Sequence, residues 1–582
     1  MPETKSFQYQ EDQTLSLKHR SPESLMRLER MGASFPTRLS FMRTLIRRMA
    51  RECWKFERLR FEVDDQGFGT SVYAAHTPQR TYSLIAFSHA LEPDQRTDRV
   101  IAEAWDATFN LFDGIPEQED LDRLRENTPR QEAGRYLPSE LVLSRANKSL
   151  RLFDHVVKRL ADGLQPDVSL LHSVGYLMRT TAVYGSGKFG SADRAKISSR
   201  PEALGAFQIE MLNVFLIRWF SIDLVEHVAR CQGGSKAVGM KAHLKQSLGI
   251  GNATGLGMAP FLVNHPKLVH QWVSAKENAL ARVRGLKNVS RDSLQSFENL
   301  LQKVRIHISQ WQVEDELQTR KIQQLKQELE TLCQEFEKRR AQNPEYLWEQ
   351  LLTFAQSRFS LEGQELTVSM MIEPHGDLVD ELAETMHASE EMKIQPRMPL
   401  EKLKLLIEDH YQWALEIDFS QSANRKQFWY YSEDKLEPRL GDRFQEPGEE
   451  LEMPLAVARD VSELYGTLEK KPGDQSTAEF LMGHPEFRRT VRRVQSLHSF
   501  PYAEIRDNLI GENVKPIDLL RFKLAFFGAT KFDPKSDLWT RITMFQGAPM
   551  PEELTTCDPD AWAFPVLPGQ DEGSLAAPVV AE

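Results

Sequence analysis

Leu59-Arg60-Phe61-Glu62-Val63 alternates apolar and charged residues, a period of two that places one kind on each face of a β-strand. Two further short segments of strand-like composition, 71–74 and 82–87, follow it after the turn-forming sequences at 65–67 and 77–79. The short connections favour neighbouring antiparallel strands. The sequence therefore predicts a small antiparallel sheet near the N-terminus.

Helical spacing of apolar residues surrounds these strands. Residues 22–52 carry apolar side chains at helical spacing among arginines, with a break near Pro36, and predict two basic helices. Residues 101–112 place four large apolar side chains on one helical face, so they are also expected to form a helix. Beyond Pro138 the pattern predicts further helices at 140–160, 168–180 and 207–230.

The most apolar helical segment, 211–228, contains three charged residues, Arg218, Asp223 and Glu226. Charges at those depths would be costly in a lipid bilayer. The segment is therefore expected to be a buried core helix, and no membrane partner is expected.

The second half of the chain shows both kinds of pattern. Residues 290–342 carry mixed charges and an apolar stripe at spacings of three and four, which predicts a helical hairpin or arm. A second strand-bearing unit is expected near 365–431, around a helix at 400–410. Its predicted strands are 366–372, 413–419 and 427–431. The predicted fold class is α+β, predominantly helical, with two strand regions around a helical middle region.

The length of 582 residues exceeds the size at which one hydrophobic core keeps growing, so several packing units are expected. We predict five regions. They are N-terminal helices and strands at 1–135, a helical region with two glycine-rich loops at 136–288, a charged helical arm at 289–362, a mixed α+β unit at 363–547, and a mobile tail rich in proline, acidic and small residues at 548–582.

The bulk composition is that of a soluble globular protein, with 41% hydrophobic and 27% charged residues. A formal net charge of -11 argues against general affinity for nucleic-acid phosphates. The four cysteines lie far apart without a CxxC pair, and the polar N-terminus lacks the apolar core of a secretory signal. We therefore expect a cytoplasmic protein in a reducing compartment.

The first candidate site is the stretch 179–190, in which three glycines alternate with Ser186 and Lys188. Backbone N–H groups of such a loop can turn toward one point, and the two side chains can bind phosphate or carboxylate. The stretch is not a P-loop, because Phe189 follows Gly187-Lys188 and the preceding segment is expected to be a helix. The alternative is a glycine helix cap followed by a surface turn with an exposed lysine.

The second candidate site is the glycine-rich stretch 249–257, which superficially matches a dinucleotide-binding fingerprint. Its context argues against that function, because 241–248 is expected to be a polar helix and the fingerprint requires a buried strand there. A loop that closely approaches some ligand is more credible, with Asn252 and Thr254 as polar contacts and His265 nearby. The alternative is a connection between two helices.

Arginines elsewhere allow two interpretations. Arg145 lies in a segment rich in hydrogen-bonding residues and can bind an anionic substrate through two parallel hydrogen bonds. Pairing with a local carboxylate such as Asp98, Asp106 or Glu132 is the more frequent explanation. The aromatic run 428–431 can likewise stack on a planar ligand, although packing within a sheet is the commoner role.

Carboxylate and imidazole groups come together at 373–377 and in the Glu384-x-x-His387 sequence. One ExxH motif is half of a di-iron signature, and no second copy is present. An acidic, solvated helix that starts near Asp377 is the favoured explanation. No metal site is predicted.

The leading hypothesis is a soluble cytosolic enzyme that acts on a small carboxylate or phosphate compound through the glycine-rich loops. The candidate catalytic residues are Lys188, Tyr184 and His265. The candidate substrate-binding residues are Arg179, Ser186, Gly187, Asn252, Thr254 and Arg145. The residues identify neither a reaction type nor a cofactor.

Two other functions remain open. A non-enzymatic interaction protein would use the helical arm and the basic N-terminal helices as docking surfaces, and it predicts exposed apolar patches. A nucleic-acid-associated protein would use the arginines at 43–51 and 488–493. Convergence of the two glycine-rich loops on one cavity would favour the enzyme.

Overall fold

A computed structural model describes most of the chain. The described residues are 19–90, 105–130, 137–180, 190–191, 204–254, 266–311, 313–387, 392–421, 429–432, 437–440, 453–454, 457–506, 516–529, 531–534 and 540–566. Within them the fold is α+β and helix-rich, as predicted.

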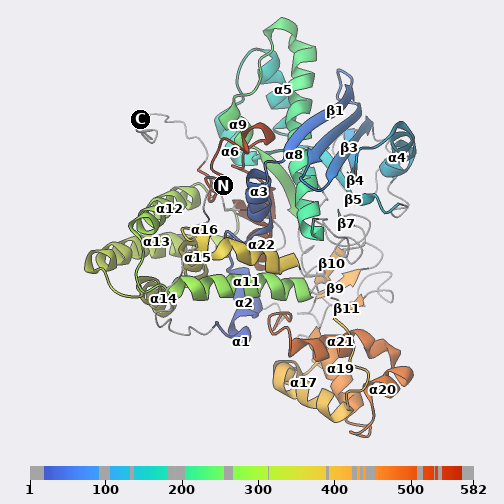
Figure 1. The fold of residues 1–582 in the computed structure, drawn as a ribbon, viewed down its shortest axis with the longest axis vertical. Helices are drawn as coiled ribbons and strands as arrows, with labels where there is room; N and C mark the ends of the chain where they lie inside the picture. The colour runs from blue at the N-terminus through green and yellow to red at the C-terminus, as the bar shows by residue number, and fades with distance from the viewer. Residues whose placement is uncertain are drawn as a thin grey trace, which may run out of the picture.

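A ten-stranded sheet organises the first half of the chain and takes its last two strands from near the C-terminus (Figure 1). The order is β1-β2-β3-β4-β5-β6-β8-β13-β12, and β7 also pairs with β5. The strands are β1 (Lys55–Val63), β2 (Gly69–His76), β3 (Thr81–Ala90), β4 (Trp105–Asp113), β5 (Glu140–Lys148), β6 (Tyr176–Thr180), β7 (Gly190–Ser191), β8 (Gly249–Thr254), β12 (Lys531–Pro534) and β13 (Thr540–Met544). β6 and β8 are parallel, and the other pairings among the described strands are antiparallel.

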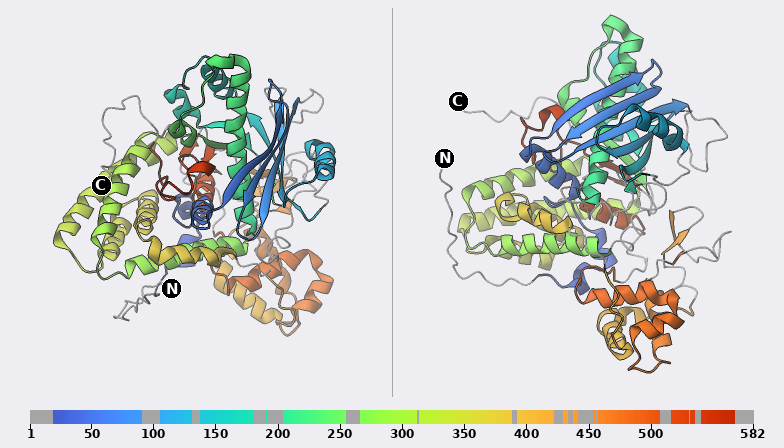
Figure 2. Two further views of the ribbon diagram at one scale, coloured as in Figure 1. Left: turned by 45° about the horizontal axis from the view of Figure 1, so that its top comes forward. Right: turned by 45° about the vertical axis from the view of Figure 1, so that its right-hand side comes forward.

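The sheet curls around the long helix α8 (Ala206–Gly233), as Figure 2 shows. Phe220 of α8 packs edge-on against Phe109 of β4, and Trp219 packs against Tyr73 of β2. The opposite face of the sheet is covered by α4 (Gln118–Arg130), whose Leu121 and Leu124 join a small second core. The central strands are therefore buried on both faces.

Helix α8 is the buried core helix expected from the sequence. Arg218, one of the three charged residues in the segment 211–228, is 1% exposed and donates hydrogen bonds to five backbone carbonyls. Those carbonyls belong to Lys245, Gln246, Leu248, Ala548 and Pro549. Burial lowers the pKa of Arg218 to about 9. These hydrogen bonds hold residues 245–248, directly before β8, and residues 548–549 against the core helix. None of the helices in the described part of the chain is both long and apolar enough to cross a membrane.

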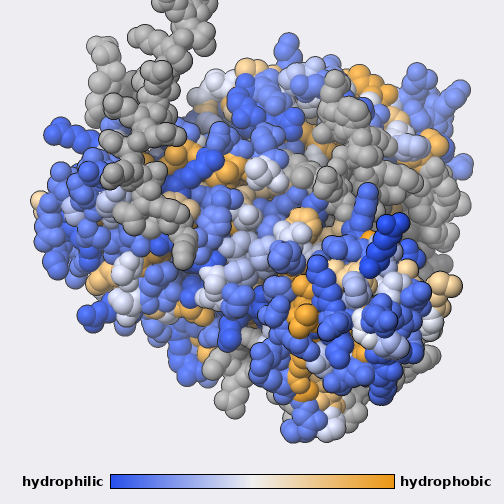
Figure 3. All heavy atoms as spheres, turned by 60° about the horizontal axis from the view of Figure 1, so that its bottom comes forward, coloured by the Kyte–Doolittle hydropathy of each residue, from blue (hydrophilic) through white to orange (hydrophobic). Residues whose placement is uncertain are grey.

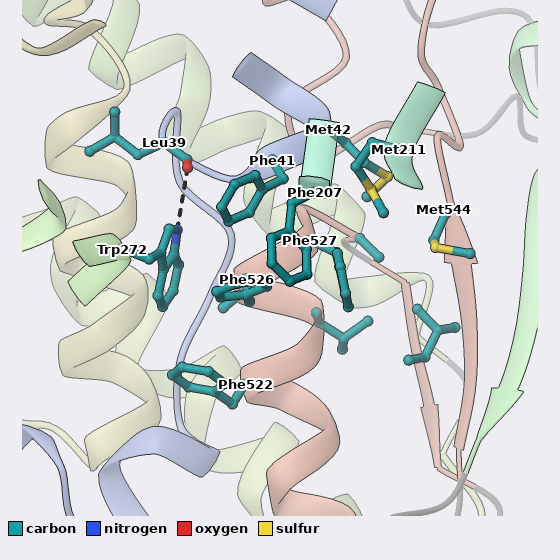
Figure 4. Close-up of a cluster of buried hydrophobic side chains, with 14 of the residues drawn as sticks. Leu39, Phe41, Met42, Phe207, Met211, Trp272, Phe522, Phe526, Phe527 and Met544 are labelled. Carbon is teal, nitrogen blue, oxygen red and sulfur yellow. Dashed lines mark hydrogen bonds between the residues drawn. The ribbon is translucent and has the colours of Figure 1, made fainter. Parts of the chain in front are cut away.

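The sheet and the helical half share a core, drawn in Figure 4. It contains residues of α3 (Phe41–Arg51), the start of α8, α11 (Pro266–Arg284), α22 (Pro516–Phe527) and β13. Trp272 of α11 packs on Phe522 and Phe526 and donates a hydrogen bond to the carbonyl of Leu39, at 3.3 Å. Helix α22 is thereby held against both halves of the molecule.

The helical half begins with α1 (Pro22–Leu25) and α2 (Leu28–Gly32), which with α3 match the basic helices predicted around Pro36. The predicted helical hairpin corresponds to α12 (Arg291–Ser309) and α13 (Glu316–Gln342). Next come α14 (Leu347–Arg358), α15 (Leu361–Ile372), α16 (Gly376–Val379) and the 3-10 helix η3 (Asp380–His387). The remaining elements of the sheet half are α5 (Phe153–Ala161), α6 (Val168–Val174), η2 (Gly234–Lys236), α9 (Ala242–Gln246) and η6 (Pro551–Glu553).

A small group of helices lies at one end of the molecule (Figure 1). It comprises α17 (Leu400–Leu415), α19 (Val457–Leu468), α20 (Thr477–Gly483), η5 (Pro485–Phe487) and α21 (Arg488–Leu497). A three-stranded sheet of order β10-β9-β11 accompanies it, formed by β9 (Trp429–Ser432), β10 (Glu437–Leu440) and β11 (Met453–Pro454).

Several predicted elements differ in the structure. The N-terminal sheet is not small, because β4, β5 and β6 replace parts of the predicted helices at 101–112, 140–160 and 168–180. Trp105 and Phe109 of β4 face the α8 side, whereas Phe112 faces α4, so burial on both faces imitates a helical pattern.

The second strand region also differs. Residues 366–372 belong to helix α15, in which every residue from Glu362 to Ile372 is buried. A helix that is buried on all sides shows no periodicity in its apolar residues. Residues 413–419 cover the end of α17 and the turn after it, and only the prediction at 427–431 overlaps a strand, β9.

Candidate functional site

The two parallel strands, β6 and β8, define the candidate site. Arg179 of β6 lies opposite Gly251 of β8, and the strands end at Thr180 and Thr254. Parallel neighbours have their carboxyl ends at the same edge of a sheet. Both glycine-rich stretches that the sequence singled out continue along the chain from these two ends.

Two expectations about these stretches are wrong. The first stretch follows a strand, since α6 ends at Gly175, whose φ of 80° turns the chain from helix to β6. Most of the second stretch is itself a strand, β8. Its glycines allow close packing, because a Cβ atom at Gly251 would lie 2.6 Å from the ring of Tyr176.

The pairing along β5 locates the first stretch more closely. Thr180, the last residue of β6, lies opposite Ala146, and Gly190 of β7 lies opposite Leu143. Thr180 and Gly190 are therefore both held against β5, and only Ser144 and Arg145 of β5 lie between their partners. The predicted site residues Tyr184, Ser186, Gly187 and Lys188 belong to the intervening segment, which lies outside the described residues.

Asn252 of β8 links the strand ends to a buried lysine. Its side-chain nitrogen donates to the carbonyl oxygen of Thr180, at 3.0 Å. Its side-chain oxygen accepts a hydrogen bond from Nζ of Lys523, at 3.3 Å. Both residues are 1% exposed. Lys523 reaches this position because β13 pairs with β8 and α22 packs against β13.

The electrostatic surroundings of Lys523 are unusual for a lysine. Burial lowers the pKa of its ammonium group to about 7, and the nearby carboxylate of Glu210 opposes this shift only in part. Glu210 lies near the start of α8 and is 1% exposed. The amine can therefore gain or lose a proton near neutral pH.

Arg145 of β5 pairs with a carboxylate, the structural alternative considered for it. Its Nε lies 2.5 Å from Oδ2 of Asp106, and Asn147 donates to Oδ1 of the same carboxylate, at 2.9 Å. Burial raises the pKa of Asp106, whereas Arg145 acts to lower it. This pair lies one strand away from Arg179, which is opposite Asn147 in the register of β5 and β6.

The other predicted residues are placed in part. Arg179 is half-buried, and no hydrogen bond or ion pair joins its guanidinium to the residues that the structure describes. Thr254 is the last residue of β8, and His265 lies outside the described residues. Arg145, Arg179 and Asn252 therefore lie on three adjacent strands, whereas the position of the predicted catalytic groups is not described.

The sequence interpretation missed Lys523 and Glu210. Each interrupts a strongly apolar helical run, 522–527 and 207–220 respectively. A charged residue inside such a run is a sign of a buried charge, because lysine and glutamate are almost never fully buried without a specific reason. That signal was present in the sequence, but it does not reveal which strand the lysine meets.

Several described residues bear on the two alternative functions. Arg43 and Arg47 are engaged by Glu373, Asp380 and Asp560 and are largely buried. Among the described residues of the arm, Ile306 is the large apolar side chain that is exposed. The face seen in Figure 3 is mainly hydrophilic, with apolar side chains scattered over it.

The groups considered for a metal have other contacts. Glu373 accepts hydrogen bonds from Arg43, and the ring of His375 packs edge-on against Trp348. Within the described part of the chain, no three histidine, cysteine or acidic residues are arranged to hold a metal ion.

Comparison with known proteins adds no relative: no family model matches the sequence, and neither the curated proteins nor the solved structures contain a significant match.

Proposed function

We propose that the chain is an enzyme that binds a small carboxylate or phosphate compound at the carboxyl ends of β6 and β8 and transfers a proton through Lys523. The observation that carries the proposal is the buried contact between Lys523 and Asn252, whose amide is tied to the last residue of β6. Burying a cation costs free energy, and strongly perturbed ionisable groups are concentrated at functional sites.

Lys523 can serve two purposes. With a pKa of about 7, it is present in comparable amounts as an ammonium and as a neutral amine at neutral pH. The ammonium attracts an anionic group, and the amine accepts a proton from a bound substrate. Asn252 holds Nζ in place, and Glu210 favours the charged form.

Anion binding is assigned to residues around the same strand ends. Arg179 has a guanidinium without a partner among the described residues. Its position opposite Gly251 puts its side chain on the other face of the sheet from Asn252, so its donors can meet the same carboxylate or phosphate only around the edge where the strands end. Ser186 and Lys188 follow β6 closely in the chain and are retained as further contacts. Arg145 is assigned a supporting role, because its guanidinium is already paired with the carboxylate of Asp106.

The proposal is tested with inorganic phosphate and malonate as probes, by thermal shift and equilibrium dialysis. We expect both anions to stabilise the wild-type protein, by about 2.7 kcal/mol at a hundredfold excess over the dissociation constant. Lys523→Met and Lys188→Ala are expected to weaken this effect at least tenfold.

Lys276→Met is the matched control, because Lys276 is equally buried but pairs with Glu365 on α15. Its anion binding should equal that of the wild type. Unchanged anion binding in Lys523→Met, with the protein folded by circular dichroism, would contradict the proposal. Equal losses in Lys523→Met and Lys276→Met would also contradict it, since the effect would then be general.

A further inference from the structure

A surface cavity lies away from the Lys523 site, between α3, the start of α8 and η3. It has a volume of about 250 Å³. Its lining includes Arg47, Arg48 and Arg51 of α3, Gln208 of α8, and Glu384 of η3. A space of this volume accommodates a small metabolite, and the side chains around it are largely polar.

One wall of the cavity presents uncommitted hydrogen-bond donors. Arg48 donates through Nε to Glu52 and through one terminal nitrogen to Oε1 of Gln208, both at 3.0 Å. Its other terminal nitrogen has no acceptor among the described residues. Gln208 is only 4% exposed, and its amide nitrogen has no acceptor among the described residues. These two donors suit the paired oxygens of a carboxylate.

Arg51 adds an exposed positive charge at the rim. Its side chain is 67% exposed, and the nearest carboxylate oxygens, of Glu52 and Glu384, lie 3.8 and 4.0 Å away. These distances are too long for hydrogen bonds. Arg51 can therefore turn toward an incoming anionic group at little cost.

The positive charge of Arg47, which also lines the cavity, is compensated by neighbouring carboxylates. Arg47 contacts Asp560 at 3.0 Å and Asp380 at 3.4 Å, and it donates to the carbonyl of Arg38. Burial and the neighbouring charge of Arg38 lower the pKa of Arg47. Arg47 is therefore committed to the fold, and the cations left to meet a ligand in this cavity are Arg48 and Arg51.

The opposite rim carries a free carboxylate. Glu384 is 72% exposed, and its only described ion pair is the 4.0 Å approach of Arg51. A simple anion bound to Arg51 would be repelled by this carboxylate. A ligand that carries both a carboxylate and a positive group would pair with Arg51 and with Glu384 at the same time.

We propose that this cavity binds a small zwitterion of the α-amino-acid type, with its carboxylate on Arg48, Gln208 and Arg51 and its ammonium group on Glu384. The two charged groups of an α-amino acid are attached to the same carbon, which matches the close approach of Arg51 and Glu384. The site is independent of the proposed enzyme function, since it uses none of the residues around Lys523.

The test uses the twenty natural L-amino acids, one at a time, with the full-length protein in a thermal-shift screen followed by calorimetry. For the best of them, two analogues are compared: the N-acetyl derivative, which lacks the ammonium group, and the amide, which lacks the carboxylate. We expect both analogues to bind at least tenfold more weakly than the amino acid.

Two variants test separately the carboxylate-binding and the ammonium-binding side of the cavity. Arg51→Ala is expected to weaken binding of the amino acid at least tenfold, while Glu384→Gln should weaken the amino acid but not its N-acetyl derivative. Arg305→Ala, which removes an exposed pair with Glu330 on the arm, is the control and should bind as the wild type does.

Three outcomes would overturn the inference. They are no saturable binding of any amino acid, equal affinity for the amino acid and its N-acetyl derivative, and unchanged affinity in both variants. A preference for inorganic phosphate over every amino acid would also exclude the zwitterion. None of these results depends on Lys523, so failure here is distinct from failure of the proposed enzyme function.

Discussion

Two buried charges in this molecule have very different surroundings. Glu365 of α15 is 1% exposed, and three cations contact its carboxylate: Arg20 at 2.6 Å, Lys276 at 2.8 Å and Arg30 at 2.9 Å. Burial alone would raise the pKa of Glu365, but these cations together hold it well below its ordinary value. The charged form is therefore the stable one at every physiological pH.

Lys523 is equally buried, and its surroundings include the neutral amide of Asn252 and the nearby carboxylate of Glu210. Burial dominates there and lowers the pKa of the amine to about 7. The comparison teaches that burial by itself does not distinguish a structural charge from a reactive one. Where the charged partners outweigh the cost of burial, as at Glu365, the group stays in its charged form. Where burial outweighs them, as at Lys523, the pKa moves toward neutrality.

The largest effect is expected from removing the compensated charge. Glu365→Gln removes the carboxylate that three cations share and leaves the buried Lys276 without its ion pair, while Arg20 keeps Glu277, so we expect a loss of about 3–5 kcal/mol in the free energy of unfolding. Urea unfolding followed by tryptophan fluorescence measures it. Glu330→Gln, which removes an exposed partner of Arg305, is the control and should cost less than about 1 kcal/mol. Similar losses in both variants would show that the cluster around Glu365 is not specially stabilising.

The second effect concerns pH. The pKa of Lys523 is lower in the folded protein, about 7, than its ordinary value of 10.5. Between these values the unfolded chain binds more protons, so stability rises with pH, by about 2–3 kcal/mol from pH 7 to pH 9. Lys523→Met is expected to lose this contribution.

Urea unfolding of both proteins at pH 7 and pH 9 measures the difference. Lys276→Met should keep the wild-type pH dependence, because Lys523 is unchanged in it. Identical pH dependence in the wild type and Lys523→Met would contradict the lowered pKa.

The third prediction gives Lys523 a carboxylate partner of the kind that Lys276 has in Glu365. Asn252→Asp places a carboxylate beside Lys523, which should raise the lysine pKa by about 1–3 units. The gain in stability between pH 7 and pH 9 then shrinks by about 1–2 kcal/mol. Asn252→Leu is the uncharged control and should leave the lysine pKa low. If Asp and Leu gave the same pH profile, contact between Asn252 and Lys523 would be excluded.

The smallest effect is expected at an exposed charge. Arg51→Ala removes a guanidinium that has no close carboxylate, so the free energy of unfolding should change by less than about 0.5 kcal/mol. Arg43→Ala, on the same helix, removes a buried partner of Glu373 and should cost several times more. A large loss in Arg51→Ala would mean that this residue supports the fold and is not free to bind a ligand.

Part of the fold could be predicted from local patterns. The alternation at 59–63 predicted β1, because a partly solvated strand has a period of two. Strands β2 and β3 are buried along most of their length and were predicted from their strand-like composition and the turn sequences beside them. The buried nature of α8 followed from its apolar length and its few charges. Strand β4 and helix α15 were missed, because burial on every side removes the contrast on which such patterns depend.

The candidate site was predicted less completely. Arg179 and Asn252 were named from their places in the glycine-rich stretches, and the structure puts them on adjacent strands. Lys523 was not named, although it interrupts an apolar run. It lies 271 residues from Asn252 in the chain, and nothing local indicates that the two meet.

The sequence by itself determined the helix-rich α+β character and the amphipathic segments. Only the tertiary structure decided that β13 pairs with β8 and brings Lys523 onto Asn252, and that Glu365 collects three cations. The physical reason is that periodicity and propensity act over a few residues. The ionisation of a buried group depends on which distant side chains exclude water from it and which of them carry a charge.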